Sequence, residues 1–289
     1  MRERSDLWGE FAGERERICG PILRRIRERR PLVHLLTNYV TVTDCVNALL
    51  AVGAHGICSH APEEAAEVTR GADALVCNLG GTEYYDAMRY SAEAALEIGI
   101  PLVIDPVGCS ASAHRRAMCL TLIRQCRPAA VRGNYAEIRA LIRGYSDDVG
   151  LDSAGTLSER EEKRLEEEMQ EFSARTGVML IASGASDLCT DGHAFAEVHS
   201  GTPALRRITG AGCLSTALLA AFLAEENTLE AACSATAFVG TAGEAAWQAC
   251  LRTGTGAGHF HMFLMDALSS ADPIWETGDS ETSESENER

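Results

Sequence analysis

Residues 74–105 read ALVCNLGGTEYYDAMRYSAEAALEIGIPLVID, and the fold class can be inferred from this pattern. Two continuous apolar runs, Ala74–Asn78 and Pro101–Asp105, flank a segment of helical composition, Tyr84–Ile98. Strands that are apolar on both faces are typical of parallel sheets, because helices cover both sides of such sheets. The stretch therefore predicts a strand, a helix and a second strand of one parallel sheet.

The same alternation continues on both sides of this stretch. Residues 129–132 and 178–183 are further apolar runs that predict strands. Helices are predicted at Glu63–Arg70, Ala113–Cys126, Tyr135–Arg143, Ser158–Thr176, Ile208–Ala224 and Leu229–Thr253. Repeated strand–helix alternation predicts an α/β fold of three layers, in which helices flank a central, mostly parallel sheet and ligands bind at the carboxyl ends of the strands.

The chain is predicted to hold one large domain between two charged ends. Residues 1–30 contain nine arginines and six acidic residues and predict a surface helix that stops before Pro31. Residues 31–270 form the predicted α/β domain. Residues 271–289 form an acidic tail, and its lack of apolar side chains is typical of disorder.

The composition argues against several classes of function. The 289 residues carry a formal net charge of −16, which disfavours an extended surface for nucleic acid or for an anionic membrane. Lys163 is the only lysine, so the chain lacks the G-x-x-x-x-G-K-[ST] phosphate loop. No apolar run reaches the roughly 18 residues of a membrane-spanning helix, and the N-terminal residues lack a secretory signal. The eleven cysteines include no C-x-x-C pair, which favours free thiols in a reducing cytoplasm.

Polar residues stand where the predicted strands end, each beside a glycine-containing turn. They are Asn78, Asp105, Arg132 and Ser183. A single residue of this kind is often present only because the turn requires it. Four of them at the carboxyl ends of neighbouring parallel strands are expected to converge on one crevice, which makes the crevice the candidate ligand site.

The segment Ile208–Thr216, ITGAGCLST, runs directly into an apolar helix. Glycines allow a ligand to approach the backbone, and the free N–H groups at a helix start attract anions. Small residues needed for close packing are the alternative explanation. Cys213 falls in the first helical turn, where the helix dipole would lower its thiol pKa. A structural buried cysteine is the alternative for this residue.

These segments, in this order, resemble the hydroxyethylthiazole kinases. The similarity covers roughly residues 31–268 and is carried by PLVH at 31–34, TNYV at 37–40, HAPEE at 60–64, DPVG at 105–108, RGN-x-x-EI at 132–138, TGAGC at 209–213 and the segment 256–268. The G-A-G-C ending combined with T-N-Y-V and A-P-E-E makes the resemblance specific to this family rather than to kinases of the same fold in general.

The resemblance implies a ribokinase-like fold and phosphoryl transfer from ATP, with Mg²⁺, to the primary alcohol of 4-methyl-5-(2-hydroxyethyl)thiazole in thiamine salvage. It also implies a homotrimer with sites at subunit contacts. Cys213 matches the family's catalytic cysteine, a general base. Further positions match the thiazole site (Asn38, Val42, Gly210), the ATP site (Arg132, Ser183, Thr209, Gly212) and the acidic residues near Mg²⁺ (Asp105, Glu137). An ion-pair or capping role is the alternative for the two carboxylates.

Departures from the family pattern concern the alcohol end of the site. Leu35, Val42 and Gly81 replace or interrupt residues that are common there, so the acceptor stays open. A kinase of another heterocyclic alcohol, such as hydroxymethylpyrimidine, is one alternative; a nucleotide- or thiazole-binding regulator without turnover and a redox sensor are others. His34 and His60 could touch the pocket or be structural. His259 and His261 fall in a predicted helix, which argues against a metal pair.

Overall fold

The computed structural model describes residues 17–144 and 157–269. Within these residues one eight-stranded sheet has the order β2-β1-β3-β4-β5-β6-β7-β8. The six strands from β2 to β6 pair in parallel, and β7 and β8 are antiparallel additions at one edge. The strands are β1 Leu32–Leu36, β2 His55–Ile57, β3 Ala74–Asn78, β4 Leu102–Asp105, β5 Ala130–Asn134, β6 Met179–Ser183, β7 Asp187–Thr190 and β8 Phe195–Val198.

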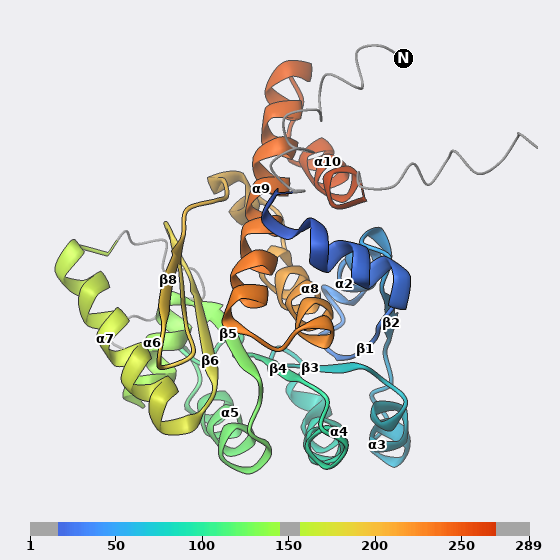
Figure 1. Cartoon of the computed structure of the whole chain (residues 1–289), viewed down its shortest axis with the longest axis vertical. Helices are drawn as coiled ribbons and strands as arrows, with labels where there is room; N and C mark the ends of the chain where they lie inside the picture. Colours follow the sequence, from blue (N-terminus) through green and yellow to red (C-terminus); the bar gives the residue numbers. More distant parts are fainter. Residues whose placement is uncertain (1–16, 145–156, 270–289) are drawn as a thin grey trace, which may run out of the picture.

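Helices cover both faces of the sheet, so the predicted three-layer α/β fold is confirmed (Figure 1). One layer comprises the helix at residues 17–29, α2 (Val42–Ala51), α8 (Ala211–Glu225), α9 (Leu229–Thr253) and α10 (Ala257–Ser269). The other comprises α3 (Pro62–Arg70), α4 (Tyr85–Ile98), α5 (Ala113–Cys126), α6 (Tyr135–Arg143) and α7 (Glu159–Thr176). Two short 3₁₀ helices, η1 (Thr82–Tyr84) and η2 (Pro203–Arg207), lie in connections.

The strands divide their side chains between the two layers with a period of two. In β3, Ala74 and Val76 belong to the core under α8, whereas Leu75 and Cys77 belong to the core under α4 and α5. Val103, Ala130 and Ile181 lie on the α8 side in the next three strands. Because alternate residues of a strand share a face, the polar residues two positions further on also face α8. They are Asn78, Asp105, Arg132 and Ser183.

Helix α8 is held rigidly over this row. Its residues 214–223 are all buried, and its apolar side chains occur around its whole circumference. A helix that is apolar all round is stable only when it is enclosed by other elements. The Phe222 and Phe238 rings, with centroids 5.9 Å apart, pack α8 against α9. This packing sets where the first turn of α8 lies relative to the strand ends.

Most of the predicted elements are confirmed within a residue or two, but four strands were not indicated by the sequence pattern. Strand β1 carries a histidine, His34, inside its apolar run, and β2 has only three residues. The hairpin of β7 and β8 alternates polar and apolar residues over only four positions in each strand. The predicted helix start at Ile208 is wrong: α8 begins at Ala211, and Gly210 is its N-cap.

The N-terminal helix is more than a surface element. Residues 17–29 are helical, and Cys19, Ile22, Leu23 and Ile26 are buried in the core beside α8 and α9. Residues 1–16 and the predicted acidic tail at 271–289 lie outside the described residues, so the domain boundaries stay predictions. Among the helices that the structure describes, none has the length and apolar character needed to cross a bilayer.

Candidate active site

Three of the predicted strand-end residues meet the first turn of α8 in one place. Asn78 Nδ2 donates to Asp105 Oδ2 at 2.9 Å, and the two residues are directly paired between β3 and β4. Arg132, in β5, donates from Nη1 to the carbonyl oxygen of Gly212 at 3.1 Å. The predicted convergence of strand ends is therefore confirmed for these three residues, because each contacts α8 or the polar residue at the end of the adjacent strand.

The start of α8 presents unsatisfied backbone donors. Gly210, the N-cap residue, has a φ of +84°, and no side chain caps the helix. The first intrahelical bond is from Leu214 N to Gly210 O, so the amides of residues 211–213 precede the helical ladder. Gly212 and Thr209 are exposed. A helix start of this kind is suited to an anion such as a phosphate.

Gly210 meets both a conformational and a packing requirement. Its positive φ is one that side chains rarely adopt, and a Cβ there would lie 2.8 Å from Thr41 Cγ2. The close approach brings the residues just before α2 against the residues just before α8. Val42 is the first residue of α2, so two predicted substrate residues, Val42 and Gly210, lie at the adjacent starts of two packed helices.

The Cys213 thiol lies among polar partners, yet it is not a thiolate. Asn78 Nδ2 lies 3.1 Å and Asn38 Nδ2 3.8 Å from its sulfur. Burial, followed by the charge of Asp105, raises the pKa of Cys213 to about 12. The predicted lowering of this pKa is wrong, because desolvation and a neighbouring carboxylate outweigh the hydrogen bonds to the sulfur.

Asp105 is buried and accepts two hydrogen bonds on one oxygen. Its Oδ2 receives Asn78 Nδ2 and Thr216 Oγ1, the latter at 3.1 Å. Burial raises the pKa of Asp105 to about 6, although Arg132 and the hydrogen bonds act in the opposite direction. The Cys213 thiol also hydrogen-bonds to this carboxylate. The carboxylate therefore contacts Asn78, Cys213 and Thr216, side chains from β3 and α8.

Glu137 has the capping role that was weighed as an alternative. Its Oε2 accepts from the backbone N–H of Asn134 at 3.0 Å. Asn134 Oδ1 in turn accepts from the backbone N–H of Glu137, which completes a capping box at the start of α6. Its Oε1 accepts from Gly108 N at 2.8 Å, in the loop that follows Asp105. Burial and the charge of Asp105 raise the pKa of Glu137 to about 7.

The acceptor side of the site is formed by residues 37–41, between β1 and α2. Asn38 Oδ1 accepts from the amides of Val40 and Thr41 at 3.1 and 3.2 Å, which closes a tight turn. Asn38 Nδ2 then points back to Asn78 Oδ1 at 3.2 Å. At the tip of the turn, Tyr39 is 78% exposed and Val40 57% exposed. This half of the site therefore ends in an open apolar surface.

Ser183 lies beside Asn134, and no hydrogen bond among the described residues joins it to the cluster around Cys213. It pairs with Asn134 between β5 and β6, and its Oγ donates to Gly133 O at 3.2 Å. Thr216 was missed by the sequence analysis, although a hydroxyl inside an apolar helix, four residues after Gly212, is a usable signal. Asn78 was noticed only as a strand-end residue, and its central place in the hydrogen bonding has no sequence signature.

His34 has a structural role, whereas His60 lies against the acceptor turn, with its Nε2 3.1 Å from the carbonyl oxygen of Thr37. His34 is buried between Thr69 Oγ1 and Ser59 O, and burial lowers its pKa to about 4. His60 contacts the Tyr84 ring, with centroids 4.1 Å apart. His259 and His261 lie in α10, as predicted. Over residues 17–144 and 157–269, no group of three or more histidine, cysteine or acidic side chains forms a metal cluster.

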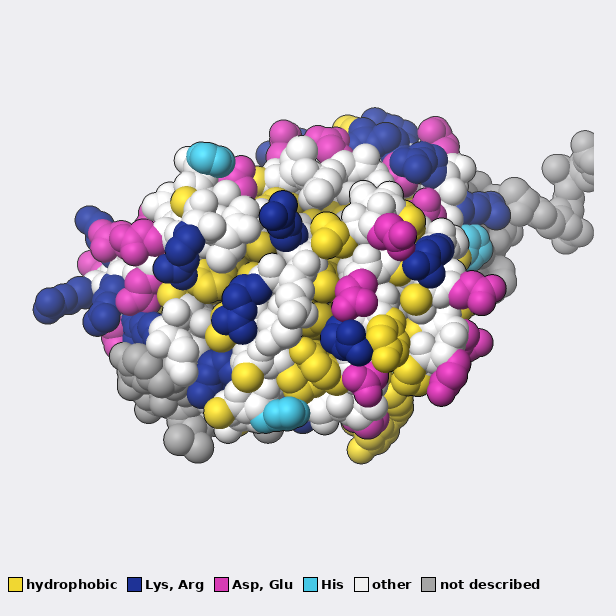
Figure 2. All heavy atoms as spheres, turned by 90° about the horizontal axis from the view of Figure 1, so that it is seen from below, with side chains coloured by type: hydrophobic (Ala, Val, Ile, Leu, Met, Phe, Trp, Pro, Cys, Tyr) yellow, Lys and Arg dark blue, Asp and Glu magenta, His cyan; other side chains and the backbone are white. Residues whose placement is uncertain are grey.

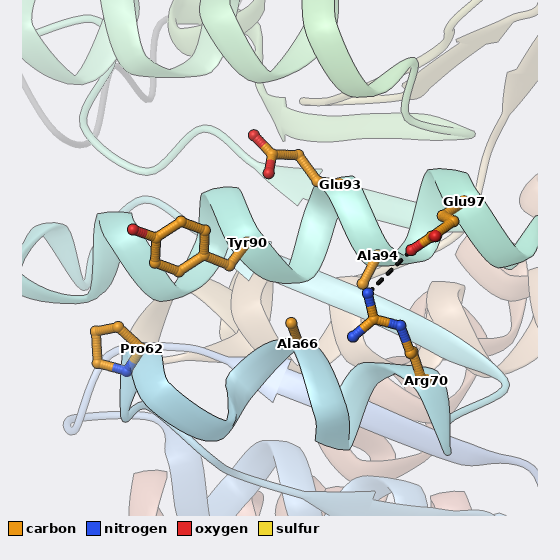
Figure 3. A pocket seen from close by; sticks show the side chains of 7 residues that line it. All are labelled: Pro62, Ala66, Arg70, Tyr90, Glu93, Ala94 and Glu97. Carbon is orange, nitrogen blue, oxygen red and sulfur yellow. Dashed lines mark hydrogen bonds and ion pairs between the residues drawn. The ribbon is translucent and has the colours of Figure 1, made fainter.

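A separate open groove of about 420 Å³ runs between α3 and α4, in the helical layer opposite α8 (Figure 3). Ala66 and Ala94 line it, and an ion pair of 2.9 Å between Arg70 and Glu97 lies at one end. None of its lining residues belongs to the candidate site. On the face seen from below, basic and acidic side chains are interspersed with apolar ones (Figure 2).

The comparisons with known proteins agree on one family. The model of the hydroxyethylthiazole kinase family matches residues 23–273. A protein of Nitratidesulfovibrio vulgaris named hydroxyethylthiazole kinase is 39% identical over 252 residues, which cover 86% of this chain and 91% of that protein. Hydroxyethylthiazole kinase 1 of Methanosphaera stadtmanae is 36% identical over 258 residues, which cover 86% and 90%.

Solved structures support the same conclusion. The structure of a hydroxyethylthiazole kinase protein from Pyrococcus horikoshii has a TM-score of 0.77 and 34% identity, covering 86% of this chain and 92% of that one. A ribokinase-like superfamily protein from Enterococcus faecalis has a TM-score of 0.53 at 15% identity, covering 83% and 86%, which shows that the fold is ribokinase-like. By sequence and by structure, this chain belongs to the hydroxyethylthiazole kinase family.

Proposed function

We propose that this protein transfers the γ-phosphoryl group of ATP to the primary alcohol of 4-methyl-5-(2-hydroxyethyl)thiazole. The observation that supports this most directly is the meeting of Asp105, Arg132 and Cys213 at the uncapped start of α8. In such a reaction the bond between the γ-phosphorus and its bridging oxygen breaks, and a bond to the alcohol oxygen forms. Catalysis of this step rests mainly on positioning and on stabilising charge.

Asp105, Arg132 and the first turn of α8 form what we call the phosphate half of the site. This half would bind the phosphoryl group through hydrogen-bond donors that are fixed in place. The backbone amides of residues 211–213 and the buried guanidinium of Arg132 can face the charge that spreads over the transferred group. Arg132 is itself oriented by the carbonyl oxygen of Gly212, so the cation and the amides keep a constant relation to each other. Thr209, exposed just before α8, and Ser183, at the end of β6, would contact the nucleotide through their hydroxyl groups.

The carboxylates suit Mg²⁺. Asp105 carries a buried carboxylate at the end of β4, and Glu137, whose two oxygens accept backbone N–H groups, lies close enough for Asp105 to raise its pKa. Mg²⁺ is commonly held by one or two carboxylates together with substrate phosphates and waters, so this pair is sufficient. The cation would supply neutralisation of phosphate charge. Asp105 and Glu137 would hold it beside Arg132, which balances the remaining negative charge of the pair.

Cys213 would act as a neutral thiol in the resting site. Its pKa of about 12 means that the sulfur carries its proton near pH 7. In a loose phosphoryl-transfer transition state the attacking alcohol keeps its proton until late, so a strong base is not required early in the reaction. We assign to Cys213 the orientation of the acceptor hydroxyl and help in its late deprotonation, a contribution on the order of 10²–10⁴-fold. In that step the sulfur would take the hydroxyl proton while the thiol proton passes to the hydrogen-bonded Asp105 carboxylate.

The acceptor half would bind the thiazole ring with Asn38, Val42 and Gly210. Tyr39 and Val40 at the tip of the same turn are mostly exposed, which leaves apolar surface for another subunit to cover. We therefore propose a homotrimer in which subunit contacts complete the acceptor pocket. Light scattering on the purified protein tests the assembly: a trimer mass is expected, and a monomer that is fully active would contradict it.

A cytoplasmic location fits the cysteine chemistry. All eleven cysteines are free thiols, and several are buried among apolar side chains. Such a set is stable in a reducing compartment. We propose that the partners are small molecules, ATP and the alcohol, rather than nucleic acid or membrane, in line with the formal net charge of −16.

A coupled assay of ADP release tests the proposed function. The wild-type protein is incubated with ATP and either the thiazole alcohol or hydroxymethylpyrimidine, each with Mg²⁺ and with excess chelator. We expect Mg²⁺-dependent ADP release with the thiazole alcohol. Faster release with hydroxymethylpyrimidine would assign a different acceptor, and binding of both ligands without release would assign a regulator rather than an enzyme.

A further inference from the structure

The Asn78 side chain connects the two halves of the candidate site. It is only 1% exposed, at the end of β3. Its Nδ2 lies 2.9 Å from Asp105 Oδ2 and 3.1 Å from Cys213 Sγ. Its Oδ1 accepts from Asn38 Nδ2 at 3.2 Å and from the Gly80 amide at 2.9 Å. The amide thus joins four separate parts of the chain.

The orientation of this amide is unambiguous. A backbone N–H can only donate, so the atom facing Gly80 N must be the carbonyl oxygen of Asn78. The NH₂ group must then face the carboxylate of Asp105 and the sulfur of Cys213. A flipped amide would set its oxygen against an oxygen of the Asp105 carboxylate, and its N–H groups against the N–H groups of Gly80 and Asn38. Each hydrogen-bonding position is therefore matched to its partner.

The hydrogen-bonding capacity of Asn78 is fully used inside the protein. A primary amide offers two N–H donors and two acceptor lone pairs, and all four are engaged here. No capacity is left for a substrate, so Asn78 acts through its partners. Those partners are the predicted catalytic thiol, a predicted Mg²⁺ carboxylate and a predicted acceptor-binding amide.

We propose that Asn78 is a positioning residue that sets Cys213, Asp105 and Asn38 at fixed relative places, so that the acceptor hydroxyl meets the phosphoryl group in line. This inference rests on the proposed function. Misplacement of reacting groups by about 1 Å can cost 10²-fold in rate without weakening ground-state binding. The role therefore predicts a loss in kcat rather than in the KM for either substrate.

The first test is a double-mutant cycle of Asn78→Ala and Cys213→Ala, measured as kcat and KM with the thiazole alcohol. We expect Asn78→Ala to lower kcat by about 10²-fold and to change each KM by less than about threefold. The double variant should lose much less than the product of the two single losses, because the amide acts partly through the thiol. Independent losses, or a loss confined to KM, would overturn the proposal.

A second, milder variant tests the proposal even if Asn78→Ala fails to fold. A Cβ at Gly80 would lie 2.7 Å from Asn78 Oδ1 and 3.0 Å from Asn38 Nδ2, so Gly80→Ala should displace the amide without removing it. Gly258→Ala is the matched control, because a Cβ there meets nothing within 4 Å. Gly80→Ala should lower kcat about tenfold, and Gly258→Ala should leave it unchanged. Equal kcat values would overturn the proposal.

Crystal structures of the Asn78→Ala variant and of the wild type separate this proposal from the proposed function. We expect the Cys213 sulfur to adopt another rotamer and Asn38 to move when the amide is absent. Thr190→Val, which removes another buried hydrogen-bonding side chain remote from the site, should leave Cys213 in place. If Cys213 and Asn38 keep their positions in Asn78→Ala, the proposal is refuted whatever the substrate. A wild-type protein that is inactive on the thiazole alcohol would refute the proposed function alone.

Discussion

The two halves of the candidate site are built in opposite ways. The phosphate half consists of Asp105 and Arg132 on adjacent strands, both buried, together with the first turn of a buried helix. The acceptor half consists of a short turn at residues 37–41, and its tip side chains, Tyr39 and Val40, are mostly exposed. The charged side chains of the candidate site are thus enclosed within one chain, whereas its apolar tip is exposed.

This difference follows from the physical demands of each half. Stabilising phosphate charge requires dipoles and cations that do not reorganise during the reaction, and buried strand ends and helix starts provide them. Recognition of an apolar ring requires enclosing surface, which a second subunit can supply. The departures from the family pattern at Leu35, Val42 and Gly81 all fall in or beside the acceptor half.

The largest effect is expected from the phosphate half. Arg132→Ala should lower kcat by about 10³-fold, because it removes a buried cation from the transferred group and frees the Gly212 carbonyl. The coupled ADP-release assay measures this loss. Arg124→Ala, which removes an exposed arginine from α5, is the control and should retain wild-type kcat. A loss of less than tenfold in Arg132→Ala would mean that the amides alone carry the charge.

Gly212→Val should be the next most damaging change, with a loss of several hundred-fold that exceeds the loss in Cys213→Ala. A Cβ at position 212 meets only Arg132 Nη1, at 3.8 Å, so the folded chain has room for it. The added side chain would instead occupy the place where a phosphate approaches the backbone. Nucleotide binding measured by calorimetry should weaken in parallel. Kinetics like the wild type would rule out an anion site at the start of α8.

Cys213→Ala should lower kcat by about 10²-fold and leave measurable turnover, because late deprotonation is a modest contribution. Cys213→Asp should retain or raise activity, since an ionised carboxylate can take the hydroxyl proton directly, whereas a thiol whose pKa is about 12 must first give up its own proton. Both variants are compared in the same assay. Complete loss of turnover in Cys213→Asp with nucleotide binding intact would contradict a role in proton removal.

Changes at the tip of the acceptor turn should affect only one substrate. Tyr39→Ser combined with Val40→Ser removes the exposed apolar surface without touching the Asn38 hydrogen bonds, which use the Val40 and Thr41 backbone amides. The KM for the alcohol should rise about tenfold, which corresponds to the loss of roughly 1–2 kcal/mol of apolar contact. The KM for ATP should not change. Parallel rises in both KM values would show that the two halves do not bind their substrates independently.

The smallest effect concerns stability against pH. The folded-state pKa values of Asp105 and Glu137 are raised to about 6 and about 7. The folded protein therefore keeps protons that the unfolded chain has already lost, and the free energy of unfolding falls as pH rises from about 4 to about 7. Asp105→Asn should make the melting temperature of the ligand-free protein depend less on pH. At pH 8, Mg²⁺ with ATP should raise the melting temperature and so offset the loss of stability. An unchanged slope in Asp105→Asn would contradict the raised pKa.

The sequence predicted the phosphate half far better than the acceptor half. Strands such as Ala74–Asn78 are recognisable because their continuous apolar runs have a direct physical cause in double-sided burial. The polar residue at the end of each run can then be placed at the edge of the sheet from its position in the sequence alone. Strand β1 leads into the acceptor turn, and His34 interrupts its apolar run. The hydrogen-bond partners that allow this histidine to be buried, Thr69 and Ser59, are distant in sequence, so the local pattern does not indicate the strand.

Two properties of the site depended on contacts that local patterns do not contain. The helix dipole at Cys213 is visible in the sequence, but the burial and the Asp105 charge that raise its pKa arise from tertiary packing. The capping pair of Asn134 and Glu137 has a readable N-x-x-E spacing, and capping was accordingly weighed for Glu137 as the alternative to the metal binding that the resemblance implies. The structure gives Glu137 a capping role whether or not it also serves a cation.

The enclosure of α8 along ten consecutive residues has a consequence for how the enzyme would fail on heating. The helix cannot slide or tilt without separating the layers that surround it, so its leading amides have no independent local melting step. Nucleotide affinity should persist almost to the point where the whole domain unfolds, while the outer turn at residues 37–41 loosens first. Thermal inactivation would then begin as a loss of acceptor recognition in a molecule that still holds its phosphate donor.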